Sequence, residues 1–139
     1  MIDKLLTQIR DDEGWRESPY RDHLGFLTIG YGFLIDERRA VKMPRAVGDL
    51  WLELLAKEKW GDLVGRNPWL ATQPEDVQQA LANMAYQLGV DGVLGFRTML
   101  AALSVGDRVR AAEAALDSKW ARQTPERAKR AAALIRGVP

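Results

Sequence analysis

Residues 13–33 read E-G-W-R-E-S-P-Y-R-D-H-L-G-F-L-T-I-G-Y-G-F, and this stretch decides the fold of the N-terminal part of the chain. Two short strand-like runs, 18–21 and 26–31, flank a four-residue segment that begins with Asp22 and ends with Gly25. Asp at the first position and Gly at the last are typical of a type I turn. The sequence therefore predicts a β-hairpin whose corner carries Asp22 and whose returning strand carries Thr28.

An amphipathic helix is predicted just before this hairpin. Apolar residues recur at helical spacing over residues 2–12, and Gly14 favours a helix end. Glu13 would then lie at the negative end of the helix dipole, where its ionised form is disfavoured. A carboxyl that keeps its proton can act as a general acid, whereas Asp22 in a polar turn would stay ionised.

Glycoside hydrolysis uses such a pair of carboxyl groups across the bond that is cut. Asp22 could orient a water molecule or stabilise a developing cation, with Thr28 as a second hydrogen-bond partner for that water. By spacing alone, a solvated turn without a catalytic role remains the alternative.

The pattern E-G-x-R-x-x-x-Y-x-D-x-x-G-x-x-T-I-G-x-G resembles the catalytic signature of the phage-type lysozymes, the T-even endolysin family of glycoside hydrolases. Residues 83–89 (N-M-A-Y-Q-L-G) and 92–96 (G-V-L-G-F) are similar to the central helix of that family and the turn after it. Residues 118–120 and 123–130 resemble its C-terminal signature. The three motifs occur in the family's order and cover most of the chain.

The resemblance implies an α+β, mostly α-helical, lysozyme-like fold with two lobes. Residues 13–46 would form a small β-hairpin lobe and residues 47–66 a long connecting helix. Residues 1–12 and 67–139 would together form the helical lobe, so that the chain is a single lysozyme-like domain.

The resemblance also implies a muramidase that cuts the β-1,4 bond between N-acetylmuramic acid and N-acetylglucosamine in peptidoglycan. Glu13 would donate a proton, and Asp22 and Thr28 would position the attacking water, without a metal or organic cofactor. Implied substrate contacts come from Leu34, Tyr86, Gln87 and Met99. From the pattern alone, Tyr86 and Gln87 are ordinary surface or boundary residues.

Two features depart from the family pattern. Phe33 stands where the family commonly has histidine after G-x-G, and the segment Leu34–Arg45 is shorter than the corresponding segment of many relatives. Because Glu13, Asp22 and Thr28 are all in place, we expect activity with an altered stability or pH response. A catalytically silent peptidoglycan-binding module is the alternative that these departures favour, and a lytic transglycosylase, which uses one acid, is another.

Helical patterns dominate the rest of the chain. Helices are predicted over 47–65, from Pro74 to about 88, and over 96–103, with a tight turn at Gly89, Gly92 and Gly95. A further apolar stripe is predicted from Val109 to Trp120. The last helix should begin at Pro125, with Thr124 as its cap.

The composition excludes several classes of site. The chain has no cysteine and one histidine, which excludes disulfides and makes a transition-metal site implausible. A net charge of +1 argues against strong nucleic-acid binding, although residues 106–139 carry +4 and the rest −3. A basic face could suit anionic peptidoglycan, a nucleic acid, or solvent alone.

The expected location follows from what the N-terminal sequence lacks. No apolar run approaches the roughly 20 residues of a membrane span, and charges interrupt the first residues, so we expect neither membrane insertion nor a signal peptide. We expect a monomer made in the host bacterial cytoplasm. The resemblance implies that a holin releases it to the cell wall for host lysis.

Overall fold

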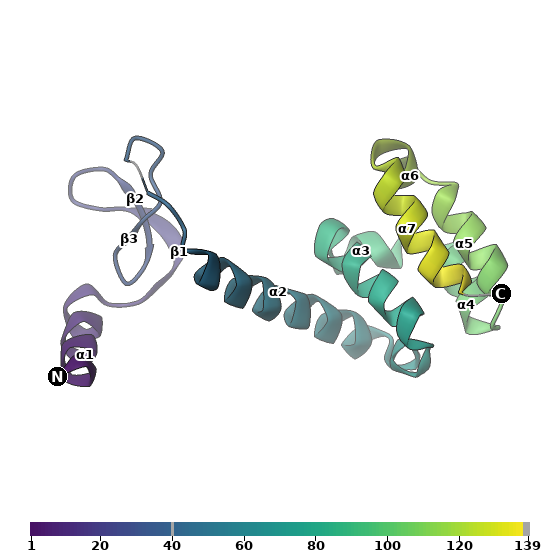
Figure 1. Ribbon diagram of the computed structural model, residues 1–139, viewed down its shortest axis with the longest axis horizontal. Helices are drawn as coiled ribbons and strands as arrows, with labels where there is room; N and C mark the ends of the chain where they lie inside the picture. Colours follow the sequence, from purple (N-terminus) through teal and green to yellow (C-terminus); the bar gives the residue numbers. More distant parts are fainter. Residues whose placement is uncertain (40, 138–139) are drawn as a thin grey trace. The chain divides into compact units, whose positions relative to one another are not determined.

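The structure, a computed structural model, describes residues 1–39 and 41–137 and divides into two units, Met1–Val47 and Gly48–Pro139. In the first unit, helix α1 (Ile2–Glu13) leads into an antiparallel sheet in the order β1-β2-β3 (Figure 1). The strands are β1 (Arg16–Arg21), β2 (Leu27–Gly30) and β3 (Phe33–Leu34). The predicted helix and hairpin are therefore both present.

Glycines set the two ends of this sheet. Gly14 ends α1 with φ 69°, and its N–H donates to the Arg10 carbonyl. Gly30 and Gly32 both have positive φ, 66° and 77°, so the chain can turn back after β2 and form a third strand. The sequence did not predict β3, because two residues are too few to show an alternating pattern.

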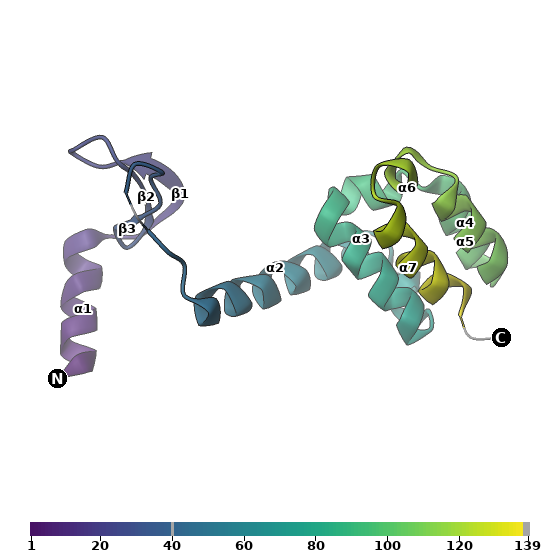
Figure 2. The ribbon, with the colours of Figure 1, turned by 45° about the horizontal axis from the view of Figure 1, so that its top comes forward.

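The second unit is helical. It contains α2 (Arg45–Arg66) from Gly48 onward, then a 3₁₀ helix η1 (Pro68–Thr72), α3 (Glu75–Leu94) and α4 (Arg97–Ser104). The chain continues through α5 (Arg108–Leu116), α6 (Lys119–Gln123) and α7 (Pro125–Arg136). Figure 2 shows the same helices turned by 45°, and α3 and α7 lie side by side in both views.

The hydrophobic core lies in this helical unit. Its largest fully buried side chains are Leu63, Leu70, Val77, Leu81, Met84, Val93, Met99, Leu103 and Ile135. Buried alanines on α5 and α7 let these two helices approach each other closely: Ala111, Ala112, Ala115, Ala128, Ala131 and Ala132. Trp60 and Trp69 lie against this core and are partly buried.

Two predictions about helix ends were wrong in part. Gly89, with φ 77°, kinks α3, but the helix resumes and runs through Gly92 to Leu94. The stripe from Val109 to Trp120 is two helices, because the Ser118 side chain accepts the Ala121 N–H and starts α6. The predicted start of the last helix is confirmed, because α7 begins at Pro125 with Thr124 at its N-cap position. The Thr124 hydroxyl does not cap α7, since it donates to the Trp120 carbonyl at the end of α6.

The α+β, mostly helical class is confirmed. The assignment of residues 1–12 to the helical lobe stays a prediction. No helix in the part of the chain that the structure describes is both long and apolar enough to cross a bilayer.

Candidate active site

The predicted turn at Asp22 is formed, and it is closed by its own backbone. The Gly25 N–H donates to the Asp22 carbonyl at 2.9 Å, and the Asp22 N–H donates to the Phe26 carbonyl at 2.9 Å. The amide groups of Leu24 and Phe26 both donate to Asp22 Oδ1 at 2.9 Å. The Phe26 N–H, with the Leu24 N–H, holds the pKa of Asp22 below its usual value, so this carboxylate is ionised at neutral pH.

Thr28 lies at the centre of the sheet, opposite Tyr20 of β1 and Leu34 of β3. It is only 2% exposed, and its Oγ1 donates to the Phe26 carbonyl at 3.0 Å. The same carbonyl accepts the Asp22 N–H. The structure therefore brings Asp22 and Thr28 together through one shared backbone acceptor, as the hairpin predicts.

Glu13 is the last residue of α1, and its carboxyl group lies against the turn between β2 and β3. A Cβ placed on Gly32 would be 2.6 Å from Glu13 Oε2 and 3.0 Å from Glu13 Cδ. Only glycine at position 32 leaves this space, and the positive φ of Gly32 fits the same requirement. Glu13 and the Asp22 turn thus lie at opposite ends of β2, with Thr28 between them along the strand.

Aromatic residues flank Gly32, the residue against which the Glu13 carboxyl group lies. The Trp15 and Tyr31 rings are tilted with centroids 5.0 Å apart, and Phe33 meets Tyr31 edge-on at 6.2 Å. Phe33 also covers Gly30, where a Cβ would be 2.7 Å from Phe33 Cδ2. Phe33 therefore makes aromatic and backbone contacts at this end of the sheet, and it remains 57% exposed.

Sequence reasoning missed a second charged group in this unit. Asp36 is 3% exposed and pairs with Arg38, whose Nη2 reaches the Gly25 carbonyl of the Asp22 turn. The short, charged segment Leu34–Arg45 gives no sign of burial in its sequence, because an acid and an arginine two residues apart are common in solvated loops. The sequence signal for the Asp36–Arg38 pair is its position directly after the strand that ends at Leu34.

Three of the four implied substrate contacts lie in the helical unit, and Leu34 lies in β3. Tyr86 is 42% exposed, so its ring is accessible from solvent. Gln87 Oε1 accepts the Trp120 indole N–H at 2.9 Å, which fixes the orientation of its amide. Met99 is 1% exposed and belongs to the core.

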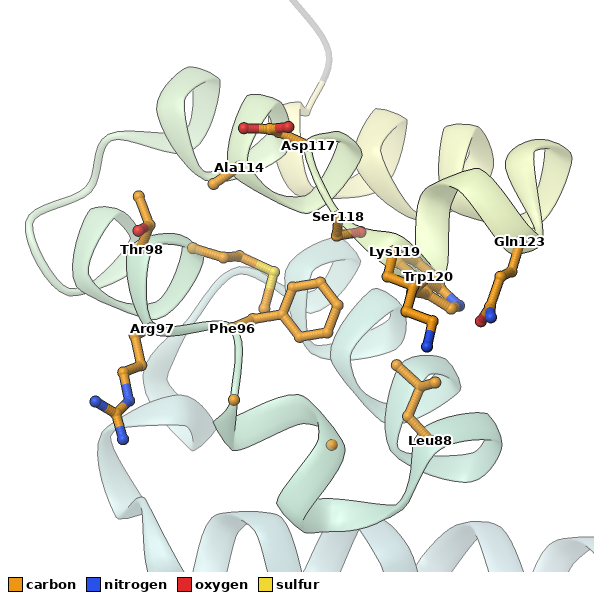
Figure 3. A pocket seen from close by; sticks show the side chains of 13 residues that line it. Leu88, Phe96, Arg97, Thr98, Ala114, Asp117, Ser118, Lys119, Trp120 and Gln123 are labelled. Carbon is orange, nitrogen blue, oxygen red and sulfur yellow. The ribbon is translucent and has the colours of Figure 1, made fainter.

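Met99 and Trp120 line an open pocket of about 540 Å³ in the helical unit (Figure 3). The Phe96 ring lies inside this pocket and meets Trp120 edge-on, with centroids 5.8 Å apart. Lys119 and Gln123 add polar groups at its margin. In the range that the structure describes, no group of three or more acidic or histidine side chains is arranged to hold a metal ion.

Comparison with known proteins identifies the family. A family model described as phage lysozyme matches residues 10–136. The chain belongs to the phage lysozyme family. Its function is therefore lysozyme-like and related to peptidoglycan.

Three relatives of different lengths are similar to this chain. It is 33% identical to the pre-baseplate central spike protein Gp5 of Enterobacteria phage T4, over 94% of this chain but only 27% of that protein. It is 28% identical to a protein of Dictyostelium discoideum named "Probable T4-type lysozyme 1", covering 97% of this chain and 95% of the relative. A second protein of that organism, "Probable T4-type lysozyme 2", is 27% identical over 94% of this chain and 92% of the relative. The alignment with Gp5 spans 162 positions, more than the length of this chain, so that protein has residues that this chain lacks.

Proposed function

We propose that this lysozyme is a muramidase that hydrolyses the β-1,4 bond between N-acetylmuramic acid and N-acetylglucosamine in bacterial peptidoglycan. The observation that carries the proposal is the shared Phe26 carbonyl, which ties ionised Asp22 to Thr28 on the strand whose other end adjoins Glu13. A glycosidase needs two carboxyl groups of unequal proton affinity on either side of one bond.

Each residue has one role in the reaction that we propose. The Glu13 carboxyl group protonates the oxygen of the leaving sugar as the bond to the anomeric carbon breaks. Asp22 accepts a proton from a water molecule through Oδ2, the oxygen that neither turn amide holds, and that water attacks the anomeric carbon. Thr28, whose hydroxyl proton is donated to Phe26, offers the water an acceptor.

We propose an inverting reaction, as the family resemblance implies. Inverting glycosidases leave about 6.5–9.5 Å between the two carboxyl groups, which makes room for a water molecule. Direct attack by that water inverts the anomeric centre. Release of the retained anomer first would contradict this route.

We also propose the substrate contacts that the family resemblance implies. Tyr86 would lie along the sugar rings, and the amide of Gln87, oriented by Trp120, would bind their polar groups. Leu34 would supply an apolar contact from β3. Met99, being buried, would serve as the floor of the open pocket rather than as a direct polar contact.

The biological role that we propose is host lysis by a monomer that requires no cofactor. The protein would be made in the bacterial cytoplasm and would reach the wall through a holin. The 33% identity to a central spike protein favours a second role, wall penetration during infection. Detection of the chain in purified phage particles, and not only in lysates, would favour that second role.

The decisive experiment measures the release of reducing ends from purified peptidoglycan. We expect Glu13→Gln and Asp22→Asn each to lower the rate by about a thousandfold, as loss of an acid or base does. Glu17→Gln is the matched control, because Glu17 is an exposed carboxylate on β1. Undiminished activity of Glu13→Gln would remove Glu13 from its role.

The same assay separates the alternatives. Sedimentation of the wild-type protein with peptidoglycan, without any reducing ends, would indicate a silent binding module. Anhydro-sugar ends detected by mass spectrometry would indicate a lytic transglycosylase.

A further inference from the structure

Asp36 is buried in the first unit with both carboxylate oxygens occupied. Oδ1 accepts the backbone N–H of Arg38 at 2.9 Å and its Nε at 2.8 Å. Oδ2 accepts the Arg38 Nη2 and the backbone N–H of Leu27, both at 2.8 Å. A buried carboxylate is tolerated only when it is satisfied in this way, so Asp36 and Arg38 form a rigid bidentate pair at the start of β2.

This pair extends to the turn that carries Asp22. Arg38 Nη2 also donates to the Gly25 carbonyl at 2.7 Å, and Arg21 Nη1 donates to the same oxygen at 3.0 Å. Arg21 Nη1 lies 3.9 Å from Asp36 Oδ2, so one carboxylate attracts both guanidinium groups. Gly25 is the residue whose N–H closes the Asp22 turn.

Asp36 also fixes the strand on the Thr28 side. Its Oδ2 holds the Leu27 N–H, while the Leu27 carbonyl accepts the Ile35 N–H at 2.9 Å. Leu27 lies between Phe26 and Thr28 in the sequence. The Phe26 carbonyl accepts hydrogen bonds from both Asp22 and Thr28. We call the Asp36–Arg38 pair the clasp. It therefore binds the backbone of the site at two points, the Gly25 carbonyl and the Leu27 N–H.

We propose that Asp36 and Arg38 are positioning residues that hold the turn bearing Asp22 in register with Thr28, so that the Asp22 carboxylate keeps its orientation toward the attacking water. This inference rests on the proposed muramidase function. A displacement of about 1 Å in a catalytic group can cost a hundredfold in rate, so a clasp one turn away from Asp22 affects catalysis. Arg38 acts only through Gly25 and Asp36, and it has no chemical step of its own.

The test uses the full chain and two readouts. The first is the titration of the Asp22 carboxyl carbon by ¹³C NMR, which needs no enzymatic activity. The second is the separation of kcat from KM on soluble peptidoglycan fragments. A clasp that only stabilised the fold would change neither quantity at a temperature well below unfolding.

In Arg38→Met we expect the Asp22 titration midpoint to rise toward its ordinary value, because the amides of Leu24 and Phe26 are no longer held against Oδ1. We expect kcat to fall about tenfold with KM nearly unchanged, as for loss of transition-state alignment. Arg39→Met is the matched control. This variant removes the same charge from the neighbouring residue. Both guanidinium groups lie over the Phe26 ring, at 4.7 Å from its centroid for Arg39 and 4.8 Å for Arg38.

Arg38→Lys provides a second variant if Arg38→Met does not fold. A single ammonium keeps the charge but cannot form the bidentate pair and also reach Gly25. We expect the same changes in the same direction, at a smaller magnitude. An Asp22 midpoint unchanged from wild type in the folded Arg38 variant, or changed equally in Arg39→Met, would overturn the proposal.

The experiments distinguish a failure of the proposed muramidase function from a failure of the proposed role of Asp36 and Arg38. A wild-type protein that releases no reducing ends would refute the muramidase function, and the Asp22 titration would still decide whether the clasp orients that turn. An active wild type with an unmoved Asp22 midpoint would refute the clasp alone.

Discussion

The pKa of Asp22 is lowered mainly by the backbone amides of its own turn. The Phe26 and Leu24 amides both donate to one of its oxygens, which lowers its pKa. Glu13, in contrast, is placed by a helix end and by the space above Gly32. The two acids therefore depend on different local features, and each can be disturbed separately.

Gly32→Ala should disturb Glu13 alone. The new methyl group would lie 2.6 Å from Glu13 Oε2, and alanine is strained at φ 77°. We expect at least a tenfold loss of muramidase activity, about the effect of displacing a catalytic group, measured as reducing ends released. Gly106→Ala is the control, since Gly106 has φ 76° with nothing within 4 Å of its Cβ position. Equal activity losses in both variants would mean that strain, and not the clash with Glu13, is responsible.

Asp36 should make the stability of the protein depend on pH in the acid range. The Arg38 guanidinium and the Leu27 N–H hold the pKa of Asp36 far below its usual value. The unfolded chain then binds a proton more readily than the folded one, so the stabilisation is complete above about pH 4 and declines as pH falls below that value.

Asp36→Asn tests this dependence. We expect a lower Tm than wild type at pH 7 and a difference that shrinks steadily between pH 4 and pH 2. Glu37→Gln, at the exposed neighbouring position, should follow the wild type throughout. A Tm difference for Asp36→Asn that is constant over this range would contradict the assignment of the charge to Asp36.

Among the elements, α5 is joined to α3 and α7 by one side chain. Arg108 Nε donates to the Ile135 carbonyl at 2.8 Å, and its Nη2 donates to the Leu134 carbonyl at 3.0 Å and to Asp76 Oδ2 at 2.7 Å. The carbonyls belong to the last turn of α7, where helix carbonyls lack intrahelical partners. Asp76 lies in the first turn of α3, and the hydrogen bond from Arg108 lowers its pKa.

Arg108→Met should therefore loosen the ends of two helices at once. We expect the Tm to fall by about 5 °C or more, because two carbonyl bonds and an ion pair are lost. Arg110→Met, on the same helix but at an exposed position, is the matched control. The measurement is thermal unfolding followed by circular dichroism, and equal shifts in the two variants would contradict the role of Arg108.

Helices and turns could be predicted from the sequence where apolar residues recur at helical spacing or a glycine marks the end of the element. The helix before Gly14 and the Asp22–Gly25 turn were predicted, because their signals are local. The division between α5 and α6 was missed, because it depends on the Ser118 hydroxyl, while the apolar period continues through the break. The clasp was missed for a related reason: Asp36 becomes buried only when the returning strand brings Leu27 and Gly25 to it.

At the scale of the whole molecule, the two units differ in the kind of side chain that they bury. All the buried hydrophobic side chains in the described range lie from Leu63 onward, in the helical unit. In the same described range, the buried polar or charged side chains are Thr28 and Asp36, and both belong to the first unit. The first unit is thus held mainly by hydrogen bonds and ion pairs, and the apolar residues of α1, such as Leu5 and Leu6, are 39–40% exposed.

We therefore expect residues 48–139 to fold alone and residues 1–47 not to do so. A hydrophobic core is what allows a chain of under a hundred residues to unfold cooperatively, and chains near or below about 40 residues usually need disulfides, metals or oligomerisation to fold. Thermal unfolding of the two fragments by circular dichroism is the measurement. A non-cooperative transition for 48–139 would contradict this expectation.

The same fragment tests the prediction that residues 1–12 complete the helical lobe. If they do, a peptide of residues 1–14 in excess should raise the Tm of fragment 48–139, since a ligand that binds only the folded state stabilises it. A peptide with Leu5 and Leu6 replaced by Gln is the control, because it keeps the charges but loses the apolar stripe. An unchanged Tm with the unmodified peptide would assign the first helix to the β lobe, and Glu13 would then owe its position to Gly32 and the sheet alone.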